Sequence, residues 1–134
     1  MARRPAELTL STILPSATRP HVEAILRAAL RAADPQEALR RFLRCEQEVL
    51  SVQGINQVWS LRAYRGVYVL ALGKAAFPMA KSIRKLLGNF IRHTLIITVS
   101  ISFTLPDVEV LIGDHPIPGK GSLKAGQRLM EFVQ

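Results

Sequence analysis

The sequence predicts an α/β fold of the doubly wound kind: a Rossmann-like, three-layer, mostly parallel sheet that is incomplete and is preceded by a helical hairpin. Three observations lead to this prediction. An apolar segment at 67–72 passes without a break into an amphipathic helical pattern at 76–87. Two further β-rich segments follow at 95–101 and 108–112, and the joints between the segments are short. Strands and helices joined in this way are typical of a parallel sheet with helices on its faces.

The composition indicates one globular domain of ordinary size. Of the 134 residues, 49% are hydrophobic and 21% are charged, which suits a chain that buries a core. No apolar run approaches the roughly 20 residues that span a bilayer, and the N-terminus lacks the sustained apolar region of a secretory signal. Cys45 is the single cysteine, so no intrachain disulfide forms. We therefore expect a cytoplasmic protein that does not bind a membrane.

Positive charge is concentrated in the middle of the chain. The formal net charge is +8, and the segment 49–106 contains seven Lys or Arg residues but no Asp or Glu. Two interpretations stay open: a surface that attracts anionic ligands, or a solvated basic face. Nucleic acid is disfavoured as a partner, because only 6% of the residues are aromatic and they do not alternate with basic residues.

The first third of the chain is expected to be helical after an irregular lead-in at 1–17. A first helix begins at Arg19, where the proline that follows is tolerated in the first turn. A second helix begins at Pro35 with Asp34 as its N-cap, and its apolar positions predict that it runs to about Leu50. The two helices would form the hairpin that precedes the sheet.

An irregular connector at 51–65 is expected to lead into the first strand, at 67–72. The unbroken apolar run of this strand is typical of a strand that is buried on both faces. The helix that follows has apolar residues at helical spacing and ends at Gly88. After the two further strands, Ser122 is expected to act as N-cap of a final helix that reaches the end of the chain.

Gly73 and Lys74 stand where the first strand meets its helix. In an open parallel sheet, ligands bind beyond the carboxyl ends of the strands. A helix N-terminus there offers free N–H groups, and the lysine adds a mobile positive charge. The residues alone leave open whether this is an anion site or a tight turn with a solvated lysine. A Walker A loop is excluded, because Tyr68 replaces its first glycine and Ala75 its Ser or Thr; no G-x-G-x-x-G follows the strand either.

A second candidate loop follows the third strand and contains His115 between Asp114 and two closely spaced prolines. Proline restricts the backbone, so the loop would hold His115 in one place. His115 could donate a hydrogen bond to an anionic substrate, or act as an acid or base. It could equally be structural, with its side chain bonded to a carbonyl. Asp114 is interpreted as its orienting partner or as a turn residue. The three histidines show no metal-ligand spacing.

Two stretches together resemble a known family. VLALGKAAFPMAKSIRKLLG and, after a strand, VEVLIGDHPIPGKGSLKAGQRLMEF resemble the N-terminal part of the glycerate 2-kinase family, whose members are often labelled hydroxypyruvate reductase. The resemblance covers about residues 20–134. It implies an enzyme much longer than this chain, with two α/β domains around the active site, that transfers phosphate from ATP, with Mg²⁺, to the 2-hydroxyl of D-glycerate.

The resemblance also implies site residues. Lys74 would be catalytic, and Gly73, Ala75 and His115 would bind substrate. The helix start at Ala75 and Ala76 would supply N–H donors to the anion.

The sequence also departs from the family pattern. The family's S-G-G-G-S-A loop, its later active-site arginine and an acidic cluster for Mg²⁺ are not found here, a polar segment is replaced by VSISF at 99–103, and Gly119 stands where an acidic residue is common. We therefore expect 18–134 to be a truncated N-terminal portion of the kinase domain that is inactive alone. Its exposed sheet edge after Ile112 favours self-association. The alternatives are a hydroxypyruvate reductase, which the missing dinucleotide motif disfavours, and a small basic module that binds polyanions.

Overall fold

The computed structural model describes residues 15–101 and 105–134. The chain divides into two compact units, 1–34 and 35–134, and each is described by itself. In the first unit, α2 (Arg19–Ala32) confirms the first predicted helix and carries its proline in the first turn. Most of the predicted lead-in at 1–17 lies outside the described residues.

The second unit begins with a short helix and an antiparallel sheet, where the sequence had predicted a long helix. The helix α3 ends at Phe42, and the following strands pair in the order β1-β2-β3. These elements are α3 (Pro35–Phe42), β1 (Leu43–Glu46), β2 (Val49–Val52), β3 (Val58–Ser60) and the 3-10 turn η1 (Leu61–Ala63). The prediction that the second helix runs to Leu50 and the prediction of an irregular connector at 51–65 are therefore wrong, whereas the second helix does begin at Pro35.

The cause is a tight turn at Gln47 and Glu48. Both residues have positive φ angles, 48° and 66°, as the two central residues of a type I′ hairpin turn require. The turn places Leu50 opposite Cys45 in the antiparallel ladder. The apolar residues that had suggested one face of a helix are thereby divided between two paired strands and α3.

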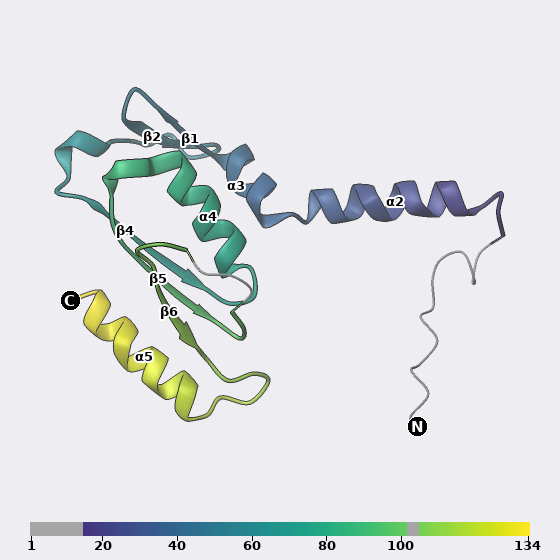
Figure 1. Ribbon diagram of the computed structural model, residues 1–134. Helices are drawn as coiled ribbons and strands as arrows, with labels where there is room; N and C mark the ends of the chain where they lie inside the picture. The colour runs from purple at the N-terminus through teal and green to yellow at the C-terminus, as the bar shows by residue number, and fades with distance from the viewer. Residues whose placement is uncertain (1–14, 102–104) are drawn as a thin grey trace. The chain divides into compact units, whose positions relative to one another are not determined.

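The parallel sheet confirms the predicted fold class. Its strand order is β4-β5-β6, and both pairings are parallel (Figure 1). The first strand coincides with the predicted range, whereas the second begins four residues earlier and ends three residues earlier than predicted. The strands are β4 (Val67–Leu72), β5 (Ile91–Thr98) and β6 (Glu109–Ile112).

Two helices lie on opposite faces of this sheet. From α4 (Ala76–Leu87), Phe77 packs on the face that carries Ala71 and Ile96. From α5 (Lys120–Phe132), the ring of Phe132 meets Tyr68 edge-on, with ring centres 6.0 Å apart. Because side chains alternate along a strand, Tyr68 and Ala71 point to opposite faces. The arrangement is therefore the expected helix–sheet–helix sandwich.

An ion pair ties α5 to the last strand. Arg128 donates to both carboxylate oxygens of Glu109, at 2.7 and 2.9 Å. This hydrogen bonding lowers the pKa of Glu109 below its ordinary value.

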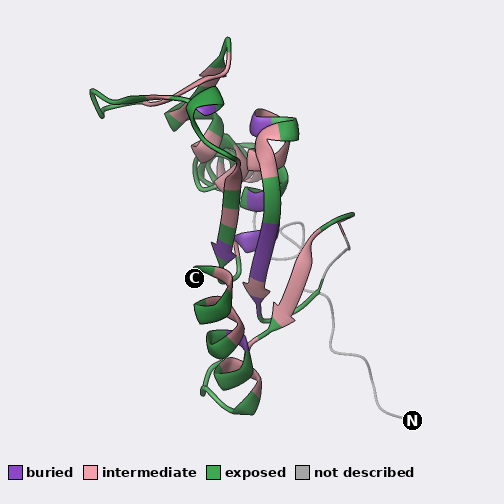
Figure 2. Cartoon of the chain, turned by 90° about the vertical axis from the view of Figure 1, so that its left-hand side faces the viewer, coloured by how far each residue is buried: buried purple, intermediate pink, exposed green. Residues whose placement is uncertain are grey.

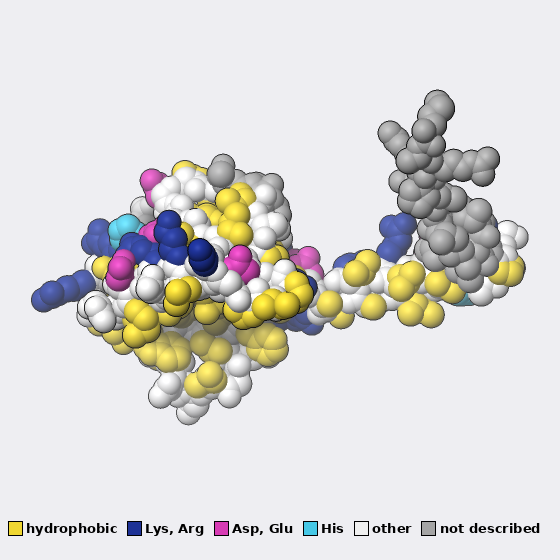
Figure 3. Space-filling model, turned by 90° about the horizontal axis from the view of Figure 1, so that it is seen from below, with side chains coloured by type: hydrophobic (Ala, Val, Ile, Leu, Met, Phe, Trp, Pro, Cys, Tyr) yellow, Lys and Arg dark blue, Asp and Glu magenta, His cyan; other side chains and the backbone are white. Residues whose placement is uncertain are grey.

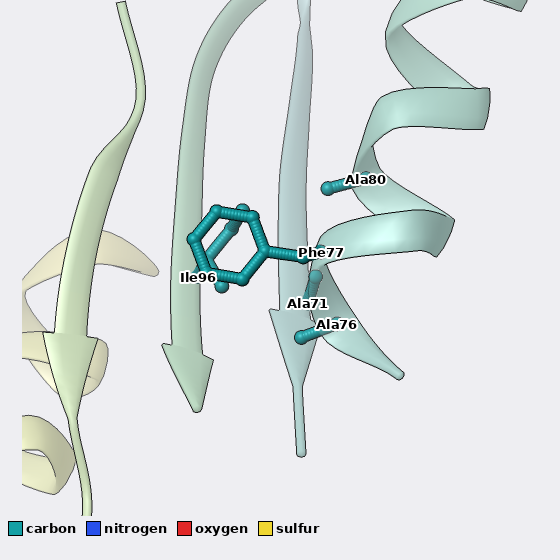
Figure 4. Packing of buried hydrophobic residues seen from close by; sticks show 5 residues of the cluster. All are labelled: Ala71, Ala76, Phe77, Ala80 and Ile96. Atoms are coloured by element: carbon teal, nitrogen blue, oxygen red, sulfur yellow. The ribbon is translucent and has the colours of Figure 1, made fainter. Parts of the chain in front are cut away.

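The core lies between α4 and the sheet (Figure 4). Phe77 fills the space left by small residues around it, and Ile96 covers it from the central strand; the buried cluster is Ala71, Ala76, Phe77, Ala80 and Ile96. The alanines let the helix approach the sheet closely, so that one large ring accounts for much of the apolar contact.

The first strand is not buried on both faces, contrary to the prediction. Tyr68, Leu70 and Leu72 are exposed at 61%, 38% and 56%. In contrast, the middle of β5 is fully buried (Figure 2). The reason is that β4 is an edge strand and α5 packs mainly against β6 and β5 and meets β4 at Tyr68 through Phe132, which leaves most of one face of β4 uncovered.

Exposed hydrophobic side chains gather on the surface seen in Figure 3, beside Lys and Arg side chains. Ile112, at the end of the last strand, is half exposed. Self-association through this edge of the sheet stays a prediction. None of the helices in residues 15–101 and 105–134 has the length and apolar character needed to cross a bilayer.

Candidate functional site

The carboxyl ends of the three parallel strands meet at one edge of the sheet, and both candidate loops start there. The Gly73 N–H donates to the Ile97 carbonyl at 2.8 Å, and the Gly113 N–H donates to the Thr98 carbonyl at 2.9 Å. The loops after β4 and β6 therefore leave the sheet on either side of the end of β5. Lys74 follows directly in one loop, and His115 follows two residues after Gly113 in the other.

Gly73 has a φ angle of +96°, and a β-carbon at this position would meet no atom within 4 Å. The glycine is therefore needed for its backbone conformation and not for lack of space. The Gly73 carbonyl accepts the Ala76 N–H at 3.1 Å. The expectation that Ala76 offers a free N–H is therefore wrong, whereas the Ala75 N–H has no acceptor among the described residues.

Lys74 is exposed at the start of α4. Within residues 15–101 and 105–134, no carboxylate or other acceptor holds its ammonium group. Ala75, the N-cap residue of α4, has no side-chain oxygen to cap the helix. A mobile positive charge thus stands beside an uncapped helix N-terminus, an arrangement that attracts anions.

His115 lies in the exposed loop between β6 and α5, and its peptide bond to Pro116 is cis. In the described part of the chain, no hydrogen bond engages the imidazole. In the alternative interpretation, His115 has a structural role and its side chain bonds to a carbonyl. The described residues contain no such hydrogen bond. The imidazole is accessible to a ligand from solution.

Asp114 caps the last helix and does not orient His115. Its Oδ2 accepts the N–H groups of Ser122 at 2.8 Å and Gly119 at 3.1 Å, and its own N–H donates to Ser122 Oγ at 2.8 Å. Hydrogen bonds from Ser122 and Gly119 lower the pKa of Asp114 below its ordinary value. The N-cap position belongs to Gly119, so the prediction that Ser122 is the N-cap is wrong.

Replacing Asp114 by asparagine should lower the melting temperature at pH 7 by several degrees, because α5 loses a charged acceptor at its N-terminus. Folding lowers the pKa of the Asp114 carboxyl group. The stabilisation by this carboxylate is therefore fully present above its pKa in the unfolded chain, about 4. It is lost as the pH falls through the lower pKa of the folded chain. The gap between wild type and variant should therefore close in acid. Thermal unfolding followed by circular dichroism from pH 7 downward measures it. Asp107→Asn, in an exposed turn, is the control; an Asp114→Asn gap that is independent of pH would contradict the capping role.

A hollow of about 340 Å³ lies at the same edge of the sheet, between the strand ends and α5. Neither Lys74 nor His115 lines it. Of the residues that do, sequence reasoning assigned only Gly73 to ligand binding; it did not assign Thr98 or Gly113, although each stands at a strand end, where a ligand would be sought. The lining residues are Leu72, Gly73, Ile97, Thr98, Val99, Gly113, Asp114, Ser122, Ala125, Gly126 and Leu129.

The described residues do not form a Mg²⁺ site. Between 15 and 101 and between 105 and 134, no three His, Cys, Asp or Glu side chains come together. The one carboxylate that lines the hollow, Asp114, already accepts two N–H groups. Mg²⁺ in proteins is usually held by carboxylates together with substrate phosphates, so these residues do not fit that ion.

Comparison with known proteins gives consistent matches. The profile of the family described as "Domain of unknown function (DUF4147)" matches residues 21–134. D-glycerate 2-kinase of Thermotoga maritima is 33% identical over 69 residues, which are 50% of this chain and 16% of that protein. Glycerate 2-kinase of Pyrococcus horikoshii is 28% identical over 106 residues, 78% of this chain and 23% of that protein.

The fold is similar to that of a solved glycerate kinase. The crystal structure of the Thermotoga maritima enzyme matches with a TM-score of 0.65 and 23% identity, over 90% of this chain and 26% of that one. This likeness confirms the α/β fold class. The chain spans between about a sixth and a quarter of the length of these relatives, and it is similar in sequence and fold to that share of a glycerate kinase.

Proposed function

The chain belongs to the DUF4147 family, and we propose that it is the N-terminal part of a glycerate 2-kinase-like enzyme. The enzyme would transfer a phosphoryl group from ATP to D-glycerate. Both matched curated relatives are named as glycerate 2-kinases, which supports the substrate class. One structural observation carries the proposal for this chain: Gly73 and Gly113 bond to successive carbonyls at the end of β5. The two loops that hold the predicted site residues thus share one edge of the sheet.

In this proposal the edge binds the negative charges of the reaction. Lys74 is the catalytic residue, and its ammonium stabilises the transferring phosphoryl group or holds the glycerate carboxylate. The Ala75 N–H donates to the same anion from the helix N-terminus. Gly73 keeps the turn in the conformation that presents both groups, and His115 donates from the loop on the other side of β5.

D-glycerate should bind to the isolated chain at this edge. A titration of ¹⁵N-labelled protein, followed by amide shifts, should perturb Gly73, Ala75 and His115 in the millimolar range. D-lactate, which lacks the primary hydroxyl but keeps the configuration at C2, is the control ligand and should shift the same amides less. Shifts confined to other parts of the chain would contradict the proposed site.

We expect the isolated chain to bind without turnover, because its described residues hold no carboxylate set for Mg²⁺. Purified chain incubated with ATP, Mg²⁺ and D-glycerate should release ADP no faster than a Lys74→Ala variant. Turnover above that variant would show that the chain is a complete catalyst and would overturn the expectation.

A further inference from the structure

We propose that the amino-terminal edge of the same sheet carries a second anion site, which takes the phosphate group of a small phosphorylated molecule between Arg84 and Arg92. It does not depend on the proposed kinase function. A pocket of about 500 Å³ lies where α4 ends and β5 begins, opposite the strand ends that carry Gly73 and Gly113 (Figure 1). Its lining residues are Arg84, Gly88, Asn89, Ile91, Arg92 and Asp107.

Arg84 is positioned by neutral acceptors. Its Nη2 donates to the Pro106 carbonyl at 2.9 Å, and its Nη1 lies 3.5 Å from Thr94 Oγ1. Thr94 is fully buried in the central strand, so one end of the half-buried guanidinium is anchored to a rigid element. These partners fix the direction of the side chain and leave its positive charge uncompensated.

Arg92 is positioned in a similar way from the other side of the pocket. Its Nε donates to the Arg65 carbonyl at 3.1 Å. Its aliphatic stem lies across Gly66, where any β-carbon would collide with Arg92 Cγ. The absence of a side chain at Gly66 therefore creates the path that Arg92 follows. The two terminal nitrogens of Arg92 make no bond within the described residues.

The charges around the pocket favour a phosphate. Neither guanidinium forms an ion pair within residues 15–101 and 105–134, and Asp107 is the one acidic residue among those that line it. Arginine binds phosphate through two parallel N–H donors, and the amide of Asn89 adds a further donor. The carboxyl end of α4 is partly negative and offsets part of this attraction, so both guanidinium groups contribute to binding.

The size of the pocket indicates a ligand larger than a bare ion. Its volume falls within the range of small-molecule sites, roughly 300–1,000 Å³. A phosphate between the arginines would leave room for the organic part of a phosphate ester along Ile91 and Gly88.

The test is a titration of the full chain with inorganic phosphate, inorganic pyrophosphate and glycerol 2-phosphate, followed by amide shifts. We expect shifts at Asn89 and Arg92 and tighter binding of the ester than of phosphate. Arg92→Gln should weaken binding about tenfold, as expected for the loss of a charge-assisted pair. Asp107→Asn should strengthen it a few-fold, because it removes the opposing charge.

Two further variants decide the outcome. Lys85 follows Arg84 in α4 but does not line the pocket. Lys85→Gln removes one positive charge there and should change the affinity for the phosphate ester less than about twofold. Gly66→Ala keeps every charge and should weaken binding by displacing Arg92. The proposal is overturned if Lys85→Gln weakens binding as much as Arg92→Gln, or if Arg92→Gln and Gly66→Ala both leave it unchanged. Lys74→Met should not alter phosphate binding between Arg84 and Arg92. A negative result for this pocket can therefore be distinguished from a negative result for the glycerate site at Lys74.

Discussion

Replacing Phe77 by alanine should destabilise the 35–134 unit by about 3–5 kcal/mol, the usual cost of removing a buried phenylalanine ring. Phe77 is 3% exposed and is the largest side chain of the buried cluster. Its neighbours Ala71, Ala76 and Ala80 are small, so little side-chain volume is available to fill the cavity. Domains of this size are stable by about 5–15 kcal/mol. The variant should therefore lose a large share of its free energy of unfolding and unfold at a clearly lower urea concentration than the wild type.

Urea denaturation followed by circular dichroism measures this loss. The matched control is Met79→Ala, two residues along the same helix, because Met79 is 37% exposed and its loss should cost about 1 kcal/mol or less. Fluorescence of Trp59 in β3 reports on the antiparallel sheet and shows whether the two sheets unfold together. Equal destabilisation by the two substitutions would contradict the assignment of the core to the interface between α4 and the parallel sheet.

Replacing Lys74 by methionine should weaken binding of D-glycerate by about tenfold or more, the value of a hydrogen bond to a charged group. Methionine keeps most of the length of the side chain and removes its charge. Lys74 has no partner in the described residues that would hold it away from a ligand, so fold stability should change little. Binding is measured by the same amide titration, and stability by thermal unfolding.

Lys85→Met is the matched control for Lys74, because it makes the same change in charge at the opposite end of α4. It should leave D-glycerate affinity within about twofold. Equal weakening by the two substitutions would mean that the ligand responds to net charge alone. In that case Lys74 would not contact the substrate.

The β4–α4 unit was predictable because its signals are local. The apolar run of β4, the turn at Gly73 and the helical spacing from Ala76 onward all lie within one short stretch of the chain. Gly88 has a positive φ angle of 52° at the end of α4, as expected of a glycine that ends a helix.

The antiparallel sheet was not predictable in this way. The turn at Gln47 and Glu48 uses left-handed conformations without glycine or asparagine, so the usual hairpin signal is missing. The leucines and phenylalanine between 39 and 50 fit a helical period equally well. Pairing with β3, which places Trp59 opposite Leu50, is a contact between distant residues that favours strands over a helix.

The parallel α/β fold, the turn at Gly73 and the positions of Lys74 and His115 after strand ends could be predicted from the residues alone, because these features depend on periodicity and on backbone preferences of neighbouring residues. Which faces are covered and which polar groups are engaged became known only from the folded chain. Asp114 looked like a partner for His115 but caps α5 through Ser122, eight residues away. Likewise, most of one face of β4 is exposed because α5 packs mainly against β5 and β6. Hydrogen bonding and burial depend on residues that lie far apart in the sequence and meet in space. The partner of an apolar or acidic residue therefore cannot be identified from its neighbours in the sequence.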